Sequence, residues 1–529
     1  MGKQNIYDYI IIGAGSAGCV LANRLTQDPS VNVLLLEAGG ADEQMEIHVP
    51  LAFSKLFLGN CDWAYYTAPQ TQVNNRKLYW PRGKVLGGSS SLNAMIYIRG
   101  NKQDYDNWQA LGNPGWSYEE VLPYFKKAQN QERGASTYHG IDGLLNVSDL
   151  RCVNPLTQAF VNATSELNLP QNNDFNGETQ EGFGFYQVTQ KNGKRCSAAL
   201  AYLHTVFSRA NLTVKTHAQV SKLLISNKRV TGVVFTQNDK EETAQADREV
   251  ILSGGAINSP QLLMLSGIGS ADELKPLGID VVVDLPGVGK NLQDHLFMAV
   301  CYNSLEPISL ATAETEENLG KFVQAGQGPL TSNVGEAGGF TKTDPSLTIP
   351  NIQFHFAPLY YINHGFTPPE GHGFTIGPTL LKPKSIGYLK LNSLDPFQSP
   401  LIDPCYLTDP QDLKVLIDGV KLAQEIASTK AFQPYCGSFY GAKLNNDSDI
   451  IQYIRNTIET LYHPVGTCKM GTDTDPFAVV DSNLRVYGIE NLRVIDGSIM
   501  PEIVSGNTNA PIIMVAEKAA DFIIRHYQE

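Results

Sequence analysis

The chain has 529 residues, of which 42% are hydrophobic and 18% are charged, and its net charge is −13. A chain of this length holds about two to four domains, and its composition is typical of a globular protein with a large core. The 53 acidic residues outnumber the 40 basic ones, and no basic runs occur. This composition argues against nucleic-acid binding, because phosphate backbones recruit clustered Lys and Arg.

The cysteines and the N-terminal residues give no sign of metal binding or export. The eight cysteines are scattered, with no CxxC pair and no Cys/His cluster at zinc spacing, so no metal site is predicted. The first residues, MGKQNIYDY, lack the apolar core of a signal peptide, and no apolar run is long enough to span a bilayer. We therefore expect a cytoplasmic protein with reduced cysteines.

The opening of the chain has the pattern of a dinucleotide-binding unit. Residues 6–12 and 31–36 are apolar runs suited to buried parallel strands, and GxGxxG at 13–18 leads into a helix from about residue 19. Glycines allow a tight turn against a pyrophosphate, and an acid after the second strand can bond a ribose hydroxyl. The pattern does not separate NAD from FAD, although the acid argues against NADP. The predicted contacts are Gly13, Gly15, Ser16, Ala17, Gly18, Glu37 and Ala38.

Two further stretches are suited to a bound anion. Residues 81–93, PRGKVLGGSSSLN, combine glycines with three serines, as expected of a loop along a diphosphate or a flavin edge. Residues 491–497 read as a buried strand ending in Asp-Gly. Residues 507–511 then open an apolar helix whose positive end can stabilise an anionic ring.

Together these motifs resemble the glucose–methanol–choline (GMC) family of flavin oxidoreductases. Four specific motifs occur in the family's order, and the resemblance covers essentially the whole chain. Beside the opening loop, these motifs are residues 81–93, residues 255–269 and the block from 463 to 509, and residues 286–295 also fit the resemblance.

The resemblance implies FAD as the cofactor. Some family members attach FAD covalently through a histidine at the position of Leu92, which has no nucleophile here, so we expect non-covalent FAD. The resemblance also assigns a backbone contact to adenine at Val220. The remaining flavin contacts that it implies are Leu86, Gly88, Asn93, Ala94, Met95, Ile96, Asp496, Gly497 and Thr508.

The resemblance places the chemistry on His463 and Asn507. A neutral histidine suits the base that takes a hydroxyl proton, because its pKa lies close to working pH. The amide of Asn507 cannot share that proton, but it can orient the substrate oxygen. Tyr462 and His355 are the predicted substrate contacts, with core packing as the alternative for His355. We interpret His295 as a structural residue near a domain junction.

We expect an α/β protein, α+β overall, with a Rossmann-like FAD-binding domain and a substrate-binding domain built on an antiparallel sheet. The FAD-binding domain is discontinuous and takes residues 1–150, 195–300 and 455–529. The substrate-binding domain takes 151–194 and 301–454. Alternation at 386–391 favours a sheet with one covered face, and a helix is predicted over 410–428 with Asp409 as its N-cap.

The predicted function is oxidation of a primary alcohol to the aldehyde by hydride transfer to flavin N5, with oxygen or a quinone as electron acceptor. Choline is the alternative substrate, for a choline dehydrogenase or oxidase; its quaternary ammonium needs an aromatic cage, for which Trp63 and Tyr65 are candidates, or a nearby carboxylate. That aromatic loop covers the flavin or the substrate entrance in the family, and plain packing is the competing interpretation. A non-redox flavin lyase or a fatty-acid photodecarboxylase on the same fold stays open, since fold does not fix function.

Overall fold

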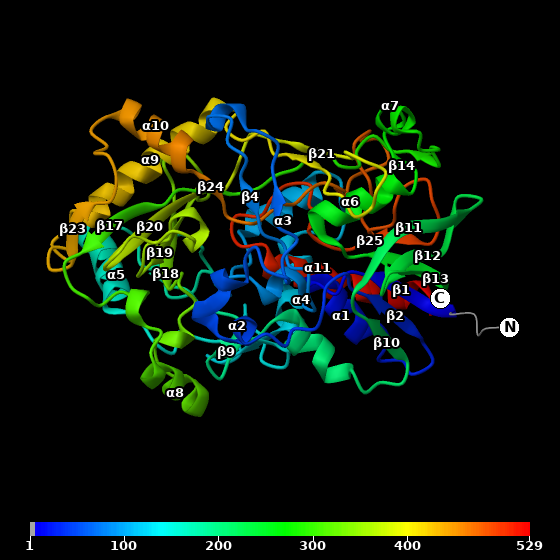
Figure 1. The fold of residues 1–529 in the computed structure, drawn as a ribbon, viewed down its shortest axis with the longest axis horizontal. Helices are drawn as coiled ribbons and strands as arrows, with labels where there is room; N and C mark the ends of the chain where they lie inside the picture. Colours follow the sequence, from blue (N-terminus) through cyan, green and yellow to red (C-terminus); the bar gives the residue numbers. More distant parts are fainter. Residues whose placement is uncertain (1–5, 529) are drawn as a thin grey trace.

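The computed structural model describes residues 6–528, within which two large β-sheets lie toward opposite ends of the molecule (Figure 1). The first has a parallel centre extended by antiparallel strands, and the second is antiparallel throughout. Helices pack around both, so the protein is a mixed α/β protein, as predicted. No helix in the described part of the chain is long and apolar enough to cross a membrane.

The parallel sheet is built around β1 (Ile6–Ile12), as its apolar run predicts. β1 pairs with β2 (Val33–Leu36) on one side and with β13 (Lys240–Leu252) on the other. β10 (Leu212–Lys215) extends the sheet beyond β2, and β25 (Leu492–Val494) pairs with β13. The predicted strands at 6–12 and 491–497 are therefore confirmed, and both end at the same edge because they run parallel.

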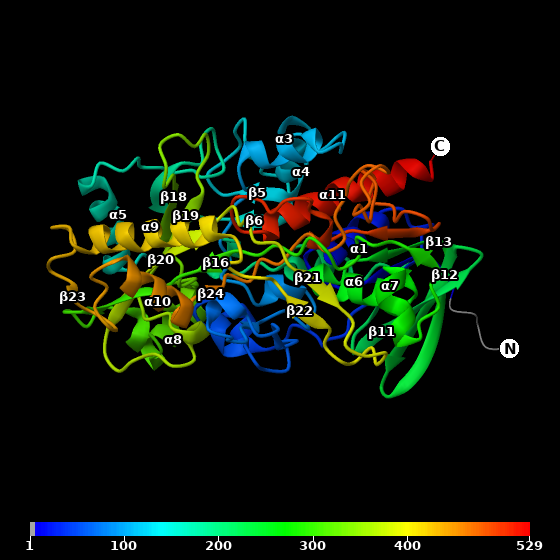
Figure 2. The ribbon, with the colours of Figure 1, turned by 90° about the horizontal axis from the view of Figure 1, so that it is seen from above.

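The helices beside this sheet begin where its strands end. α1 (Ser16–Leu25) starts three residues before the predicted Cys19, because Gly15 takes the extended N-cap position. α11 (Asn509–His526) packs against α1, and the Arg24 guanidinium donates to the buried Glu517 carboxylate at 2.7 Å. This contact joins the N-terminal and C-terminal parts of the chain, which lie side by side in both views (Figure 2).

The six longer strands of the antiparallel sheet lie in the order β23 (Cys436–Phe439), β17 (Val300–Ser304), β20 (Gly373–Leu380), β19 (Ile352–Ala357), β18 (Ala337–Thr341) and β7 (Gly182–Phe185). Two short strands join this sheet beside β20: β16 (Leu296–Phe297) pairs with β20, and β24 (Glu459–Thr460) pairs with β16. Both short strands fall in segments that the sequence assigns to the FAD-binding domain, so these segments also reach the second sheet.

One expectation about this sheet is wrong. All residues of β18, β19 and β20 are buried, so its central strands are covered on both faces rather than one. α9 (Pro410–Ala427) packs on β20, and α5 (Pro155–Glu166) packs on β7, β18 and β19. The alternating run at 386–391 instead forms β21 (Tyr388–Lys390), which pairs only with β22 (Leu401–Asp403) in a separate two-stranded sheet.

The predicted helix at 410–428 is confirmed as α9, with the Asp409 carboxylate accepting from the Gln411 N–H at 2.9 Å.

β11 (Ala218–Ser226) and β12 (Arg229–Gln237) extend the first sheet from β13. The remaining helices are α2 (Met45–His48), α3 (Lys102–Ala110), α4 (Tyr118–Ala128), α6 (Gly255–Leu265), α7 (Ala271–Leu274), α8 (Glu316–Ala325) and α10 (Asp447–Thr457). The short strands are β3 (Tyr65–Tyr66), β4 (Tyr79–Trp80), β5 (Gln129–Gln131), β6 (Leu145–Val147), β8 (Gln190–Lys191), β9 (Lys194–Arg195), β14 (Ile268–Gly269) and β15 (Val283–Asp284).

Candidate active site

One continuous cavity runs from the end of the parallel sheet to the antiparallel sheet. It brings together most of the residues that the sequence singles out. Those that line it are Gly13, Gly15, Ser16, Ala17, Glu37, Ala38, Gly88, Asn93, Ala94, Met95, Ile96, Val220, Tyr462, His463, His355, Asp496, Gly497, Asn507 and Thr508. Gly18 and Leu86 do not line it: both are buried behind the wall.

The glycines of the loop after β1 are required by close backbone contacts within the protein. A Cβ on Gly13, whose φ is +97°, would lie 2.5 Å from the Ser253 carbonyl oxygen. A Cβ on Gly18 would lie 1.9 Å from the Gly13 carbonyl oxygen, so this glycine permits helix–strand packing rather than ligand contact. A Cβ on Gly88 would lie 2.7 Å from the Cα of Gly15, so the loops at 13–18 and 81–93 touch. Only glycine fits these positions.

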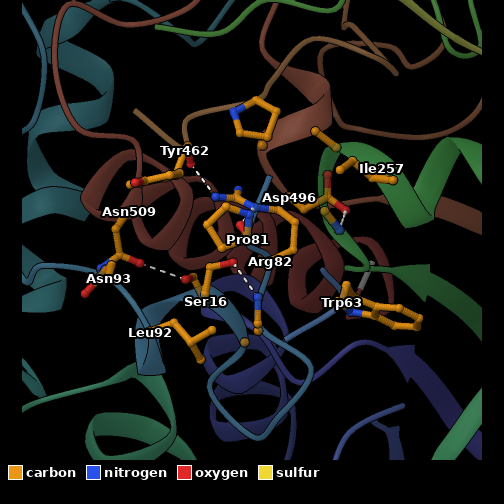
Figure 3. A pocket seen from close by; sticks show the side chains of 18 of the residues that line it. Ser16, Trp63, Pro81, Arg82, Leu92, Asn93, Ile257, Tyr462, Asp496 and Asn509 are labelled. Carbon is orange, nitrogen blue, oxygen red and sulfur yellow. Dashed lines mark hydrogen bonds between the residues drawn. The ribbon is translucent and has the colours of Figure 1, made fainter. Parts of the chain in front are cut away.

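The N-terminus of α1 is suited to a phosphate. No side chain caps this helix, so the N–H groups of its first turn are left for a ligand at the positive end of the helix. α11 likewise has no side-chain cap, and its first residue Asn509 accepts from the Ser16 hydroxyl at 2.7 Å, a contact visible in Figure 3. The two helix ends therefore meet at the same stretch of cavity. This cradle fits a dinucleotide.

Glu37 lies at the end of β2, as predicted, and its carboxylate also holds the loop. One oxygen accepts from the Ala14 N–H at 2.8 Å and the other from the Gly39 N–H at 2.9 Å. Burial raises the pKa of Glu37 to about 7, against the two N–H bonds, which lower it. A carboxylate has about four acceptor positions, so Glu37 keeps capacity for a hydroxyl in the cavity.

Asp496 joins the end of β25 to the start of α6. One carboxylate oxygen accepts from the Gly255 N–H at 2.8 Å and the Ser259 hydroxyl at 2.6 Å. The other accepts from the N–H and the hydroxyl of Ser498. These bonds fix Asp496 beside the cavity (Figure 3), which the next residue, Gly497, also lines.

His463 and Asn507 lie side by side at the other end of the cavity. The Nε2 of His463 is 3.3 Å from the Asn507 Nδ2, and the backbone N–H of His463 donates to the buried Asp294 carboxylate at 2.8 Å. Burial lowers the pKa of His463 well below its usual range, and His295, His355 and Arg82 lower it further. His463 is therefore neutral, as a proton acceptor must be.

His295 contacts His463 directly, which the sequence did not predict. The two Nδ1 atoms are 2.9 Å apart, and the His295 Nε2 is 3.1 Å from the Leu381 carbonyl oxygen. A carbonyl only accepts, so His295 carries its proton on Nε2 and offers a bare Nδ1. His463 then donates from Nδ1, which leaves the lone pair of Nε2 facing Asn507. The structural role predicted for His295 stays a prediction, and its contacts add that it sets the tautomer of His463.

The walls beyond this pair are apolar and aromatic. Phe53 and Phe57 lie with ring centroids 5.8 Å apart, and Phe57 is 5.7 Å from Tyr462. Phe297, Val334, Ala357, Tyr361 and Leu461 also line this end. The Tyr462 hydroxyl is 2.9 Å from that of Tyr361, and the Arg82 guanidinium donates to the Tyr462 carbonyl oxygen (Figure 3).

His355 lines the cavity and is also buried in the core, so its contact with a substrate stays a prediction. It is 8% exposed, and its Nδ1 is 3.1 Å from the Thr379 hydroxyl. Trp63 lines the cavity as well, stacked on Tyr65 with 5.8 Å between ring centroids. The Lys84 ammonium lies over Trp63 at 4.5 Å.

Several lining residues escaped the sequence analysis as site residues. Arg82 stands in the 81–93 motif, so the motif itself was a signal for it. Phe297 follows His295 by two residues, and Tyr361 lies in a segment without a motif. Both line the cavity only because the fold brings β16 close to the loop after β19, which local sequence patterns do not show.

The cavity, with a nucleotide cradle at one end and a neutral histidine at the other, defines a dinucleotide-dependent enzyme. Comparison with known proteins is consistent with this. The GMC oxidoreductase family models match residues 7–297 and 383–516. The chain belongs to the GMC oxidoreductase family and is an oxidoreductase.

Its relatives match over nearly the whole chain. An alcohol dehydrogenase [acceptor] from Pseudomonas putida is 49% identical, covering 98% of this chain and 96% of the relative. The mitochondrial choline dehydrogenase of Homo sapiens is 48% identical over 98% of this chain and 90% of its own. Among solved structures, pyridoxine 4-oxidase from Mesorbium loti is 30% identical with a TM-score of 0.90, covering 98% of this chain and 99% of that one.

Proposed function

We propose that the protein oxidises a primary alcohol to the aldehyde with FAD as its cofactor. The observation that carries this proposal is one cavity joining an uncapped glycine loop to a neutral histidine beside an amide. The loop at 13–18, Glu37 and the Asp496–Gly497 turn would hold FAD. Bound FAD supplies the hydride acceptor at flavin N5.

The residues at the far end perform the proton chemistry. His463 accepts the hydroxyl proton at Nε2, where the tautomer leaves its lone pair. The Asn507 Nδ2 donates to the alcohol oxygen and holds the carbon-bound hydrogen in a fixed direction. The apolar walls exclude water, which strengthens both contacts. With FAD bound, the alcohol would lose its hydroxyl proton to His463 and a hydride to the flavin, which would leave the aldehyde.

We expect FAD to be bound without a covalent link at Leu92. This side chain lines the cavity at the family's attachment position and has no nucleophilic atom. We also propose a cytoplasmic location, and oxygen or a quinone as the electron acceptor.

An uncharged alcohol suits the substrate end better than choline does. The acids among the described lining residues are Glu37 and Asp496, and both accept hydrogen bonds at the nucleotide end. A quaternary ammonium there would have Arg82 nearby and no carboxylate, and the face of Trp63 already receives Lys84. Choline remains the second candidate, because the aromatic walls alone can attract a cation and a 48% identical relative is named choline dehydrogenase.

The test is anaerobic stopped-flow absorbance with a panel of aliphatic and aromatic primary alcohols and choline. We expect the flavin to bleach rapidly with uncharged alcohols and much more slowly with choline. Mixing the reduced protein with oxygen or a quinone then identifies the acceptor. Flavin that no alcohol reduces would contradict the proposal and would favour a non-redox reaction on this fold.

A further inference from the structure

Gln353 is a buried glutamine that contacts Asn507. It lies on β19, is 0% exposed, and its Nε2 is 3.3 Å from the Asn507 Oδ1. The same nitrogen is 3.1 Å from the Tyr186 hydroxyl oxygen. Gln353 therefore links Asn507 to a second buried polar side chain, at the back of the active site.

The direction of these hydrogen bonds follows from a backbone carbonyl. The Tyr186 hydroxyl donates to the Phe354 carbonyl oxygen at 2.6 Å, and a carbonyl can only accept. The Tyr186 oxygen is then free only to accept, so Gln353 presents its NH₂ group to it. The second N–H of that group donates to the Asn507 Oδ1. The Asn507 Nδ2 is thereby turned toward His463.

A second backbone carbonyl, that of Leu381, determines which ring nitrogen of His463 carries the proton. The Leu381 carbonyl sets the proton of His295 on Nε2, and His295 sets that of His463 on Nδ1. Phe354 lies on β19 and Leu381 directly follows its neighbour β20. Two carbonyls of adjacent strands thus direct two chains of hydrogen bonds that converge in the cavity, with a bare nitrogen on His463 beside an N–H on Asn507.

We propose that Gln353 and Tyr186 are positioning residues that hold the Asn507 amide with its N–H toward the substrate. The inference rests on the alcohol oxidation proposed above. A hydroxyl needs one acceptor for its proton and one donor for its oxygen, and this arrangement supplies one of each. A reversed amide would present a second acceptor, which would draw a proton onto the His463 Nε2 and remove the base.

Simple packing does not account for Gln353. Its Oε1 is buried and has no hydrogen-bond partner among the described residues, which is a cost that an apolar side chain of the same size would avoid. Both bonds of its amide come from the nitrogen. The amide is thus suited to donate twice, which is what holding Asn507 requires.

A double-mutant cycle with Gln353→Met and Asn507→Ala tests the proposal in the FAD-loaded protein. Single-turnover reduction of the flavin by alcohol is measured under nitrogen for the wild type, both variants and the double variant. We expect Gln353→Met to slow reduction by roughly tenfold, the rate equivalent of one neutral hydrogen bond. In the Asn507→Ala background the same change should have no further effect, because Gln353 acts through Asn507.

Effects that multiply in the double variant would overturn the proposal, whereas a wild type that no alcohol reduces would overturn the proposed function instead. Gln187→Met is the matched control, since Gln187 is 5% exposed and bonds Gln131 and Asp149 away from the cavity. Its reduction rate should match the wild type. If Gln353→Met fails to fold, Tyr186→Phe removes the same anchor while keeping the ring, and it should show the same non-additivity with Asn507→Ala.

A ¹⁵N NMR measurement gives a readout that a packing role would not move. Histidine-selective labelling distinguishes bare from protonated ring nitrogens. The wild type should show a bare Nε2 on His463, assigned by its loss in His463→Ala, and Gln353→Met should shift this signal toward the protonated form. An unchanged His463 signal in a folded Gln353→Met protein would contradict the proposal.

Discussion

Replacing His463 with alanine tests the assignment of the base most directly. The substitution removes the lone pair of Nε2 while the backbone N–H of residue 463 still donates to Asp294. The glycine loop at 13–18 and Glu37, which would hold the nucleotide part of the cofactor, make no hydrogen bond to His463 among the described residues, so we expect the variant to keep its FAD. The Asn507 amide also stays, because Gln353 holds its oxygen independently of His463.

The expected loss is that of a positioned base. General-base catalysis contributes about 10²–10⁴-fold, which corresponds to about 2.7–5.4 kcal/mol of barrier at 1.36 kcal/mol per factor of ten. In the wild type, the lowered pKa of His463 keeps the ring neutral at and above the ordinary histidine value of about 6.5. The base is therefore present at high pH and lost as pH falls through the lowered value. The wild-type reduction rate should be flat from about pH 6.5 upward.

The variant should behave differently with pH. Without His463, only substrate that has already lost its proton reacts readily, so the reduction rate should rise with the alkoxide fraction as pH increases. Single-turnover reduction under nitrogen at several pH values measures both proteins. His139→Ala is the control, because His139 is also buried but bonds Gln129 and Asp174 away from the cavity. A His463 variant with a near-normal and pH-independent rate would refute the assignment.

Three further predictions concern the neighbours of the base and the cofactor. Acid or heat should release free FAD from the yellow protein, since Leu92 offers no link; flavin left on the precipitate would be the contrary result. Glu37→Ala should lower the FAD content most clearly above about pH 7, where the Glu37 carboxyl is charged, because it removes bonds to a charged acceptor worth roughly 1.5–3 kcal/mol each and loosens the glycine loop; an unchanged flavin-to-protein ratio there would show that Glu37 does not hold the ribose. His295→Ala should slow flavin reduction less than His463→Ala and should also lower the melting temperature, because it leaves His463 without its acceptor in a buried site. A destabilised variant with a normal reduction rate would make His295 purely structural.

Local patterns predicted the nucleotide end of the site well. β1, the glycine loop, α1 and Glu37 are consecutive in the chain, and each residue type there is required by backbone geometry. A Cβ on Gly13 or Gly18 would overlap backbone atoms, so the sequence has little freedom at these positions. Gly88 and Gly15 are far apart in the sequence but touch in the fold. Here too a glycine is required, because a Cβ on Gly88 would lie 2.7 Å from the Gly15 Cα.

The substrate end could not be predicted in the same way. Phe53, Phe297 and Tyr361 belong to three distant segments, and any one of them reads as an ordinary core residue. Phe297 reaches the wall because β16 joins the antiparallel sheet beside β20, and Phe53 stacks on Tyr361 with 6.3 Å between ring centroids. Similarly, the assumption of one covered face for this sheet failed because helices close one side and the cavity region buries the other.

The His463–His295 contact shows why residue identity alone leaves the chemistry open. A histidine next to a proline predicts a base only by family resemblance, and a neutral imidazole has two tautomers of which one is useful here. The choice depends on the Leu381 carbonyl, a backbone atom that any residue at that position would supply. The Phe354 carbonyl similarly decides which end of the Asn507 amide faces the cavity. Since carbonyls cannot donate, the positions of these two carbonyls fix the donor and the acceptor of each hydrogen bond that leads from Leu381 to His463 and from Phe354 to Asn507. The antiparallel sheet therefore contributes hydrogen-bond direction to the active site as well as its apolar wall, and variants that disturb β19 or β20 should affect the base without touching it.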